Sequence, residues 1–268
     1  MAVTTISTGR ASGLAVSTMQ IARRAFLRYL RTPQLVVLGT VQNALFLLCF
    51  RYVFGGAITL PGISYVDFLL PGFITTSVLF SGIGAATVVA EDLEQGFVDR
   101  LRSLPIPRLS FLAGRALADT AWSAWGLLVA TLVGFAVGFR IHGSAPEALA
   151  AFALCVAFGF AFEWFFISLG LIAGTPQAAQ GMALIVFPFT FLSSAYVPVG
   201  TMPGWLQAFA AHQPITYMVD AVRALTQGSA AEAVLGHPAE YWVLRSLLWA
   251  LGLVLLFAPL AVIKYRRS

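Results

Sequence analysis

Long apolar runs alternate with short charged stretches along the 268-residue chain. A helix needs about 20 residues to cross a bilayer, so an apolar run of this length is typical of a membrane span. The pattern predicts an all-α integral membrane protein with six transmembrane helices in a single domain over residues 33–268. The predicted spans cover residues 35–54, 68–90, 109–139, 149–173, 178–197 and 242–263.

The composition agrees with a membrane protein. Apolar residues make up 59% of the chain and charged residues only 10%, against about 25% charged residues in an ordinary soluble domain. So few charges cannot cover a surface that faces water, which excludes a disordered chain and a typical soluble enzyme. The net charge is +5, but the basic residues flank the apolar runs, so we expect membrane lipid as a partner and no nucleic acid.

The first 32 residues differ from the rest of the chain. Residues 1–12 are rich in Thr, Ser, Gly and Ala, and we expect a loose cytosolic tail. From residue 14 to residue 30, apolar positions alternate with Arg23, Arg24 and Arg28, which predicts an amphipathic helix at the membrane surface. The alternative is a basic stretch beside the membrane that only sets the topology.

The distribution of basic residues predicts the topology. An even number of spans places both termini on the same side of the membrane. If that side is the cytosol, it holds twelve of the sixteen lysines and arginines. Basic residues favour the cytosolic side, so we expect a multi-pass protein of the plasma membrane with both termini in the cytosol. The four basic residues on the other side are Arg51, Arg140, Arg223 and Arg245.

The connection between the second and third spans, residues 91–108, is the most charged stretch of the chain. Phe97, Leu101 and Leu104 are spaced by four and three residues, so a helix places them on one face. Such a face predicts a protein partner on the cytosolic side. A solvated loop whose charges only set the topology is equally compatible with the composition.

The longest external segment, residues 198–240, is too apolar for a solvated loop. Proline in mid-helix clashes with the preceding turn, so Pro214 predicts a break between two short helices. We therefore expect a re-entrant or interfacial helical hairpin.

Four further residues of this hairpin have expected positions. Trp205 and Tyr217 suit the membrane interface, where a ring is buried and its polar edge stays wet. Asp220 and Arg223 stand three residues apart on the second short helix, so we expect them to pair on its outward face.

Three ionisable residues fall inside the predicted spans, where charged groups are costly and often functional. At a rise of about 1.5 Å per residue, Glu163 lies about 16 Å from the cytosolic end of its span, and Asp119 and Arg115 lie about 15 and 9 Å from theirs. We expect a Glu163–Arg115 contact between antiparallel neighbours. The alternative is that Glu163 lines a transport path or carries a proton.

The chain carries no recognisable catalytic machinery. It has no Gly-x-x-x-x-Gly-Lys-Ser/Thr phosphate loop and no His-Glu-x-x-His motif, and its three histidines fall outside the predicted spans. We expect no catalytic residue, no metal and no cofactor in this chain. Cys49 and Cys155 lie in apolar runs without metal or disulfide spacing, so we expect both to be packing residues.

Three stretches together resemble one known family. Residues 70–73 read Leu-Pro-Gly-Phe at the start of the second span, and residues 91–105 hold the charged cytosolic segment. Residues 191–225 combine Phe-Leu-Ser-Ser, Met-Pro-Gly-Trp-Leu, Gln-Pro-Ile-Thr-Tyr and Asp-Ala-Val-Arg-Ala-Leu. In this order they resemble the type-2 ATP-binding-cassette (ABC) exporter permeases of the daunorubicin-resistance group, and the six-span plan extends the resemblance over nearly the whole chain.

The resemblance implies a permease subunit that exports a hydrophobic or amphipathic substrate, such as a drug-like molecule, a lipid or a glycolipid. Two permeases, identical or related, would pair, and each would dock a separate ABC ATPase subunit that carries ATP and Mg²⁺. The external hairpin would cap the pathway. Residues 91–108 would form the coupling helix, which contacts the ATPase through Glu91, Glu94, Gly96, Phe97, Leu101 and Leu104.

Two other functions remain open at this point. A secondary transporter or channel that works without an ATPase would be expected to show inverted repeats or broken helices at the midplane, and the two halves show no convincing repeat. A structural protein of the membrane is the third possibility.

Overall fold

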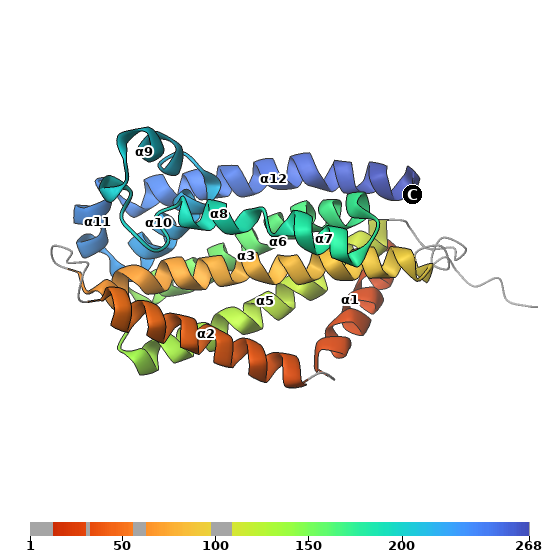
Figure 1. The fold of residues 1–268 in the computed structure, drawn as a ribbon, viewed down its shortest axis with the longest axis horizontal. Coiled ribbons are helices and arrows are strands. Elements are labelled where there is room, and N and C mark those ends of the chain that lie inside the picture. The colour runs from red at the N-terminus through yellow and green to blue at the C-terminus, as the bar shows by residue number, and fades with distance from the viewer. Residues whose placement is uncertain (1–12, 31–32, 56–62, 98–108, 268) are drawn as a thin grey trace, which may run out of the picture.

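The computed structural model describes residues 13–30, 33–55, 63–97 and 109–267. The elements that these residues form are helices, and the long ones run along the length of an elongated bundle (Figure 1). The expected all-α fold class is confirmed.

Four helices of the described residues are long and apolar enough to cross a membrane. Each contains 29 or 30 residues. At about 1.5 Å per residue this exceeds the roughly 30 Å hydrocarbon core of a bilayer. They are α3 (Tyr65–Glu94), α5 (Leu109–Val137), α6 (Ala145–Ala173) and α12 (Ala239–Arg267).

The other two predicted spans have a different form. α2 (Pro33–Phe54) occupies the first of them. The fifth is divided into α7 (Pro176–Ala183) and α8 (Val186–Phe191). Pro188 has no N–H to donate to the Leu184 carbonyl, and the Phe187 N–H donates to that carbonyl instead, at 2.9 Å. The six-span count stays a prediction.

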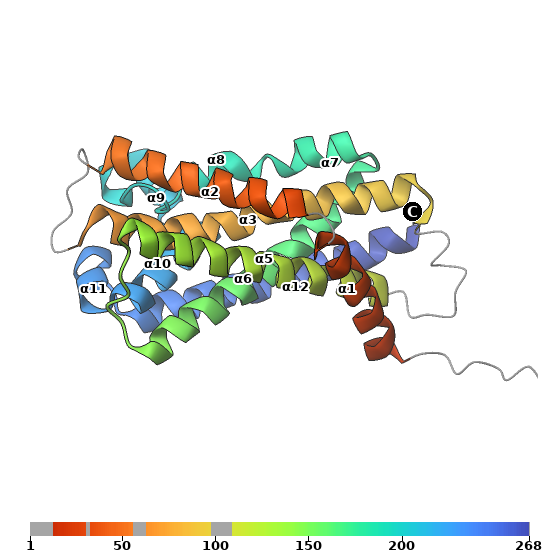
Figure 2. The same cartoon turned by 90° about the horizontal axis from the view of Figure 1, so that it is seen from below.

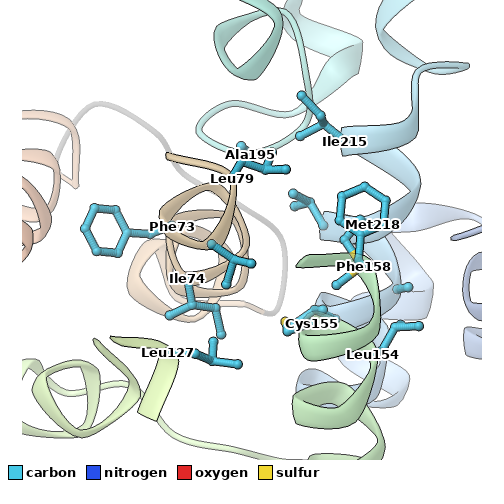
Figure 3. Close-up of a cluster of buried hydrophobic side chains, with 14 of the residues drawn as sticks. Phe73, Ile74, Leu79, Leu127, Leu154, Cys155, Phe158, Ala195, Ile215 and Met218 are labelled. Carbon is cyan, nitrogen blue, oxygen red and sulfur yellow. The ribbon is translucent and has the colours of Figure 1, made fainter. Parts of the chain in front are cut away.

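Helices α3 and α6 form the centre of the bundle and pack on each other. In the most apolar 18-residue stretch of each of these two helices, 61% is buried inside the protein, against 17% in the corresponding stretch of α12. A Cβ atom on Gly170 of α6 would lie 2.5 Å from the Ala86 carbonyl oxygen of α3, so glycine permits this close approach. Cys155 and Phe158 of α6 lie in the same buried cluster (Figure 3). Cys155 is a packing residue as expected, whereas Cys49 is exposed on α2.

The two ends of the bundle carry different elements (Figures 1 and 2). α1 (Leu14–Leu30) and the C-terminal end of α12 lie at one end, which we refer to as the α1 end. α9 (Gly204–Ala210) and α11 (Ser229–Leu235) lie at the other end, which we refer to as the α9 end. Because the helices at the two chain termini share one end, the arrangement fits an even number of crossings.

The predicted external hairpin contains η1 (Val199–Thr201), α9, α10 (Pro214–Gln227) and α11. α9 ends at Ala210 and α10 begins at Pro214, so the predicted break is confirmed. Proline fits the first helical position because its missing N–H would be unpaired there anyway. α10 is not a surface element, since its residues from Ile215 to Gln227 are buried and it packs on α3, α6 and α12.

Candidate functional site

A buried polar triad joins α1 to α5 near the α1 end. Within α5, Arg115 Nε donates a hydrogen bond to Asp119 Oδ2 at 2.6 Å. The Tyr29 hydroxyl of α1 accepts from Arg115 Nη2 at 2.8 Å and donates to Asp119 Oδ1 at 2.7 Å. Burial, and after it the Asp119 carboxylate, raise the pKa of Tyr29, so this hydroxyl keeps the proton that it donates.

Close packing of α1 on α5 makes this triad possible. A Cβ atom on Gly114 would lie 2.8 Å from the Thr18 carbonyl oxygen and 2.9 Å from Ile21 Cβ. α1 buries one side against α5 and exposes Arg23 and Arg24 on the other. The place of α1 at a membrane surface stays a prediction.

The sequence analysis did not identify Tyr29 as a site residue. The sequence does contain a pattern that could have indicated its position, a series of residues spaced by four, three and four: Thr18, Ala22, Ala25 and Tyr29. These spacings place them on one face of a helix, and that face lacks arginine. It is the face that packs on α5.

Glu163 does not have the partner that we expected. Arg115 is bound to Asp119 and Tyr29, and no ion pair joins Arg115 to Glu163, both of which the structure describes. Glu163 is 2% exposed, and its Oε2 atom has no hydrogen-bond partner within the described ranges. The expected Glu163–Arg115 contact is therefore wrong. Asp119 lies four residues after Arg115 on the same helix and binds it locally.

A cavity of about 460 Å³ lies between α2, α3, α5 and α8. Its wall combines aromatic rings, such as Trp122 and Phe187, with the hydroxyls of Thr76 and Ser81. Its size is within the range of about 300–1,000 Å³ found for small-molecule sites. The Trp122 indole also stacks on the Tyr29 ring, with centroids 4.8 Å apart. The polar triad and the cavity therefore meet at Trp122.

A second polar network is buried towards the α9 end. Arg223 of α10 is fully buried and forms an ion pair with Asp220, one turn earlier. Its guanidinium donates to the Phe68 carbonyl oxygen of α3 at 3.1 and 3.0 Å, and to the Ser194 carbonyl oxygen at 2.9 Å. Ser194 Oγ in turn donates to Asp220 Oδ1 at 2.8 Å. The network ties α10 to α3 and to the chain segment around Ser194.

The electrostatics of this pair follow from its burial. Burial raises the pKa of Asp220 and lowers the pKa of Arg223 to about 10, while the attraction between the two groups opposes both shifts. A buried charge pair is maintained only when further hydrogen bonds satisfy it, and the two carbonyls and Ser194 provide them. The expected Asp220–Arg223 pair is present, but its expected outward position is wrong because α10 lies inside the bundle.

Gly72 makes room for the segment that carries Ser194. A Cβ atom on Gly72 would lie 2.0 Å from the Ala195 carbonyl oxygen, so only glycine lets this segment cross α3. The Leu-Pro-Gly-Phe stretch at 70–73 thus contacts the 191–225 stretch. Two of the three stretches that carry the family resemblance form one contact in space.

The aromatic residues of the predicted hairpin differ in position. Tyr217 is buried, with its ring centroid 5.9 Å from that of Trp242. Its buried ring agrees with the expectation, and the place of its hydroxyl at the membrane interface stays a prediction. Trp205 of α9 is 79% exposed, and its place at the membrane interface stays a prediction.

The described part of the predicted coupling segment, residues 91–108, begins in the last turn of α3. This turn contains Glu91 and Glu94. Gly96 adopts a φ of 66°, the left-handed conformation with which helices commonly end at glycine. The helix therefore stops where glycine permits the chain to turn.

Phe97 lies between α1 and α5. Its ring centroid is 6.2 Å from that of Phe111 in α5, and the Arg24 guanidinium of α1 lies 4.8 Å above it. Part of this apolar side chain is therefore already covered within the chain. Leu101 and Leu104 lie outside the described residues, so the shared apolar face stays a prediction.

Four long apolar helices around buried ionic networks define a multi-pass membrane protein. Within the described residues, no group of three or more His, Cys, Asp or Glu side chains could hold a metal ion. A sequence model of the ABC-2 type transporter family matches residues 16–226. The chain belongs to this family.

The similarity to individual proteins extends over most of the chain. The daunorubicin resistance ABC transporter permease protein DrrB1 of Streptomyces coeruleorubidus is 32% identical over 247 residues, which are 91% of this chain and 84% of the relative. The probable doxorubicin resistance ABC transporter permease protein DrrC of Mycobacterium tuberculosis is 28% identical over 258 residues, which are 94% and 88%. The resemblance to drug-resistance permeases is confirmed.

Proposed function

We propose that this chain is the membrane subunit of an ATP-driven exporter that moves a hydrophobic or amphipathic molecule out of the cell. The two relatives above are named for resistance to daunorubicin and doxorubicin. The cavity beside α2, α3, α5 and α8 supports an amphipathic substrate, because its wall offers both aromatic rings and hydroxyls.

The energy source in this proposal is a separate ABC ATPase subunit, which binds ATP and Mg²⁺. Two permeases pair, and each docks one ATPase at the α1 end, which faces the cytosol. The six predicted spans, with both termini inside, belong to this proposal. α1 lies at the membrane surface, and residues 91–108 provide the coupling segment.

The observation that supports this mechanism best is the position of Tyr29. It lies on α1, beside the proposed docking region, and it contacts both the Arg115–Asp119 pair and the cavity wall at Trp122. A displacement of α1 by the ATPase would therefore move a residue of the cavity wall. Phe97, packed between Arg24 and Phe111, connects the coupling segment to the same two helices.

The hairpin at the α9 end is proposed to cap the pathway on the outside. α9 is the part that can move as a lid, because its Trp205 and Phe209 are exposed while α10 is buried. A cysteine at Gln207 should change its reactivity to an impermeant reagent when ATP is trapped on the partner. Equal reactivity in every nucleotide state would contradict a lid.

The proposed function is tested by reconstitution. The permease is placed in liposomes with and without its candidate ATPase subunit, and ATP-dependent uptake of daunorubicin into the liposomes is measured. We expect transport only with both subunits and ATP, and we expect Phe97→Ala combined with Leu101→Ala to lower ATPase binding. Transport by the permease alone, driven by an ion gradient, would identify a secondary transporter and contradict the proposal.

A further inference from the structure

A second cavity, of about 520 Å³, lies at the side of the bundle between α6, α8, α9, α10 and α12. Its wall is almost entirely apolar. The two polar residues in that wall already use side-chain atoms within the protein, since Gln213 Nε2 donates to the Leu192 carbonyl and His212 Nδ1 pairs with the Ala208 carbonyl. Water needs several polar partners to occupy a cavity, so this space suits a hydrocarbon chain.

Helix α12 forms one side of this cavity, and its composition is that expected of a helix that faces lipid. It is the most apolar of the four long helices of the described residues, and it is the least buried of them. Trp249, Leu253 and Phe257 of α12 line the cavity. They follow each other at intervals of four residues and so form one ridge along the helix.

Arg245 continues this ridge one turn towards the α9 end. Its side chain is exposed, and its guanidinium lies 4.8 Å from the Tyr241 ring centroid and 5.8 Å from that of Tyr217. No carboxylate in the described ranges lies within ion-pair distance of it. Among the residues that the structure describes, Arg245 therefore has no ionic partner and stands at the head of an apolar groove.

We propose that the groove and Arg245 together bind one anionic phospholipid, with an acyl chain in the groove and the phosphate at Arg245. The spacing fits, because about 6 Å of helix separates Arg245 from Trp249 and about 18 Å separates it from Phe257. That length matches about half of a 30 Å hydrocarbon core. The site is distinct from the cavity proposed for the exported substrate, since the two cavities share no lining residue, although α8 contributes to both.

The test uses a phosphatidylglycerol probe with a photoreactive group in its acyl chain, added to the purified permease in phosphatidylcholine nanodiscs. We expect saturable labelling of residues 249–257 that unlabelled phosphatidylglycerol displaces. Arg245→Gln should lower the apparent affinity about five-fold, since one basic residue near anionic lipid contributes about 1 kcal/mol. Arg245→Lys should largely retain the affinity, because it keeps the positive charge. A diacylglycerol probe with the same acyl chain lacks the phosphate, so it should bind to the unchanged protein as weakly as phosphatidylglycerol binds to the Arg245→Gln variant.

A matched pair of variants tests the groove itself. Leu253→Trp fills the groove and should abolish the saturable labelling. Leu255→Trp adds the same side chain at an exposed position of α12 that does not line the groove, and labelling should be unchanged. The unfolding temperature of each variant confirms that it folds.

Three results would overturn the proposal. Labelling that never saturates and is equal at positions 253 and 255 would mean ordinary boundary lipid. Labelling that is unaffected by Arg245→Gln would remove the phosphate contact. Cross-linking between cysteines placed at Leu253 in two copies of the chain would mean that a second permease covers the groove. None of these results bears on ATP-driven export, so the two proposals can fail separately.

Discussion

The Tyr29 ring stacks on the Trp122 indole, with centroids 4.8 Å apart and ring planes 11° from parallel. Tyr29 belongs to the helix before the first predicted span, and Trp122 lines the central cavity. The same tyrosine binds both members of the Arg115–Asp119 pair. One side chain thus links α1 to a buried ion pair and to the cavity wall.

Removal of the Tyr29 hydroxyl should weaken this link without removing the ring stack. Tyr29→Phe loses two hydrogen bonds, and we expect it to lower the free energy of unfolding by about 1 kcal/mol. Tyr29→Ala also loses the stack, which is worth about another 1 kcal/mol, and should reduce ATP-dependent export further. Thermal unfolding and vesicle transport are the measurements. Tyr52→Phe, at a tyrosine that is 74% exposed on α2, is the control, and an equal effect of the two Phe variants would contradict the role of Tyr29.

The partner of Arg115 can be identified by a rescue experiment. Arg115→Met leaves the buried Asp119 carboxylate without its ion pair, which costs about 3–5 kcal/mol of stability. A second change, Asp119→Asn, should restore much of the folded yield, because it removes the unpaired charge. Glu163→Gln should restore less. Folded yield is measured by size-exclusion chromatography and stability by the unfolding temperature. If Glu163→Gln rescues Arg115→Met better than Asp119→Asn does, Glu163 is the ionic partner of Arg115.

The contact between α3 and the segment around Ala195 depends on the absence of a side chain at Gly72. Gly72→Ala should lower stability by about 1–3 kcal/mol, because the new Cβ collides with the Ala195 carbonyl. Gly84→Ala, on the same helix, has no atom within 4 Å of its new Cβ and should gain up to about 1 kcal/mol from helix propensity. The unfolding temperatures of the two variants show whether only the substitution at Gly72 is destabilising. Destabilisation of both by the same amount would mean that the contact at Gly72 is not tight.

The proposed topology can be tested with single cysteines in a chain that lacks Cys49 and Cys155. Gln20 of α1 and Glu232 of α11 are both exposed and lie at opposite ends of the bundle. An impermeant thiol reagent added to intact cells should label Glu232→Cys and leave Gln20→Cys unmodified until the cells are opened. Labelling of Gln20→Cys in intact cells would mean that the α1 end faces outward and would contradict the proposed orientation.

Some features were predictable because they are local. A long apolar segment in lipid must satisfy its own backbone hydrogen bonds, so the run within α3 predicts a helix without knowledge of its neighbours. Pro214 interrupts a helix through its own ring and missing N–H. Asp220 and Arg223 meet because residues three apart on a helix are neighbours.

Other features depend on how the helices are arranged. Residues that face lipid and residues that face the protein interior are equally apolar, so hydrophobicity does not show that α10 is buried and α9 exposed. The contacts of Tyr29 with Asp119 and of Gly72 with Ala195 join residues far apart in the sequence, and only packing brings them together.

For Arg115 the sequence offered two acidic neighbours, Asp119 on its own helix and Glu163 on the next. The sequence alone predicted that the two carboxylates lie at similar depth and that Arg115 lies about one helical turn nearer the cytosol, because depth follows from the helical rise. The tertiary structure decided the pairing. Tyr29 reaches in from α1 to bind both Arg115 and Asp119, and this closes the triad and leaves Glu163 outside it.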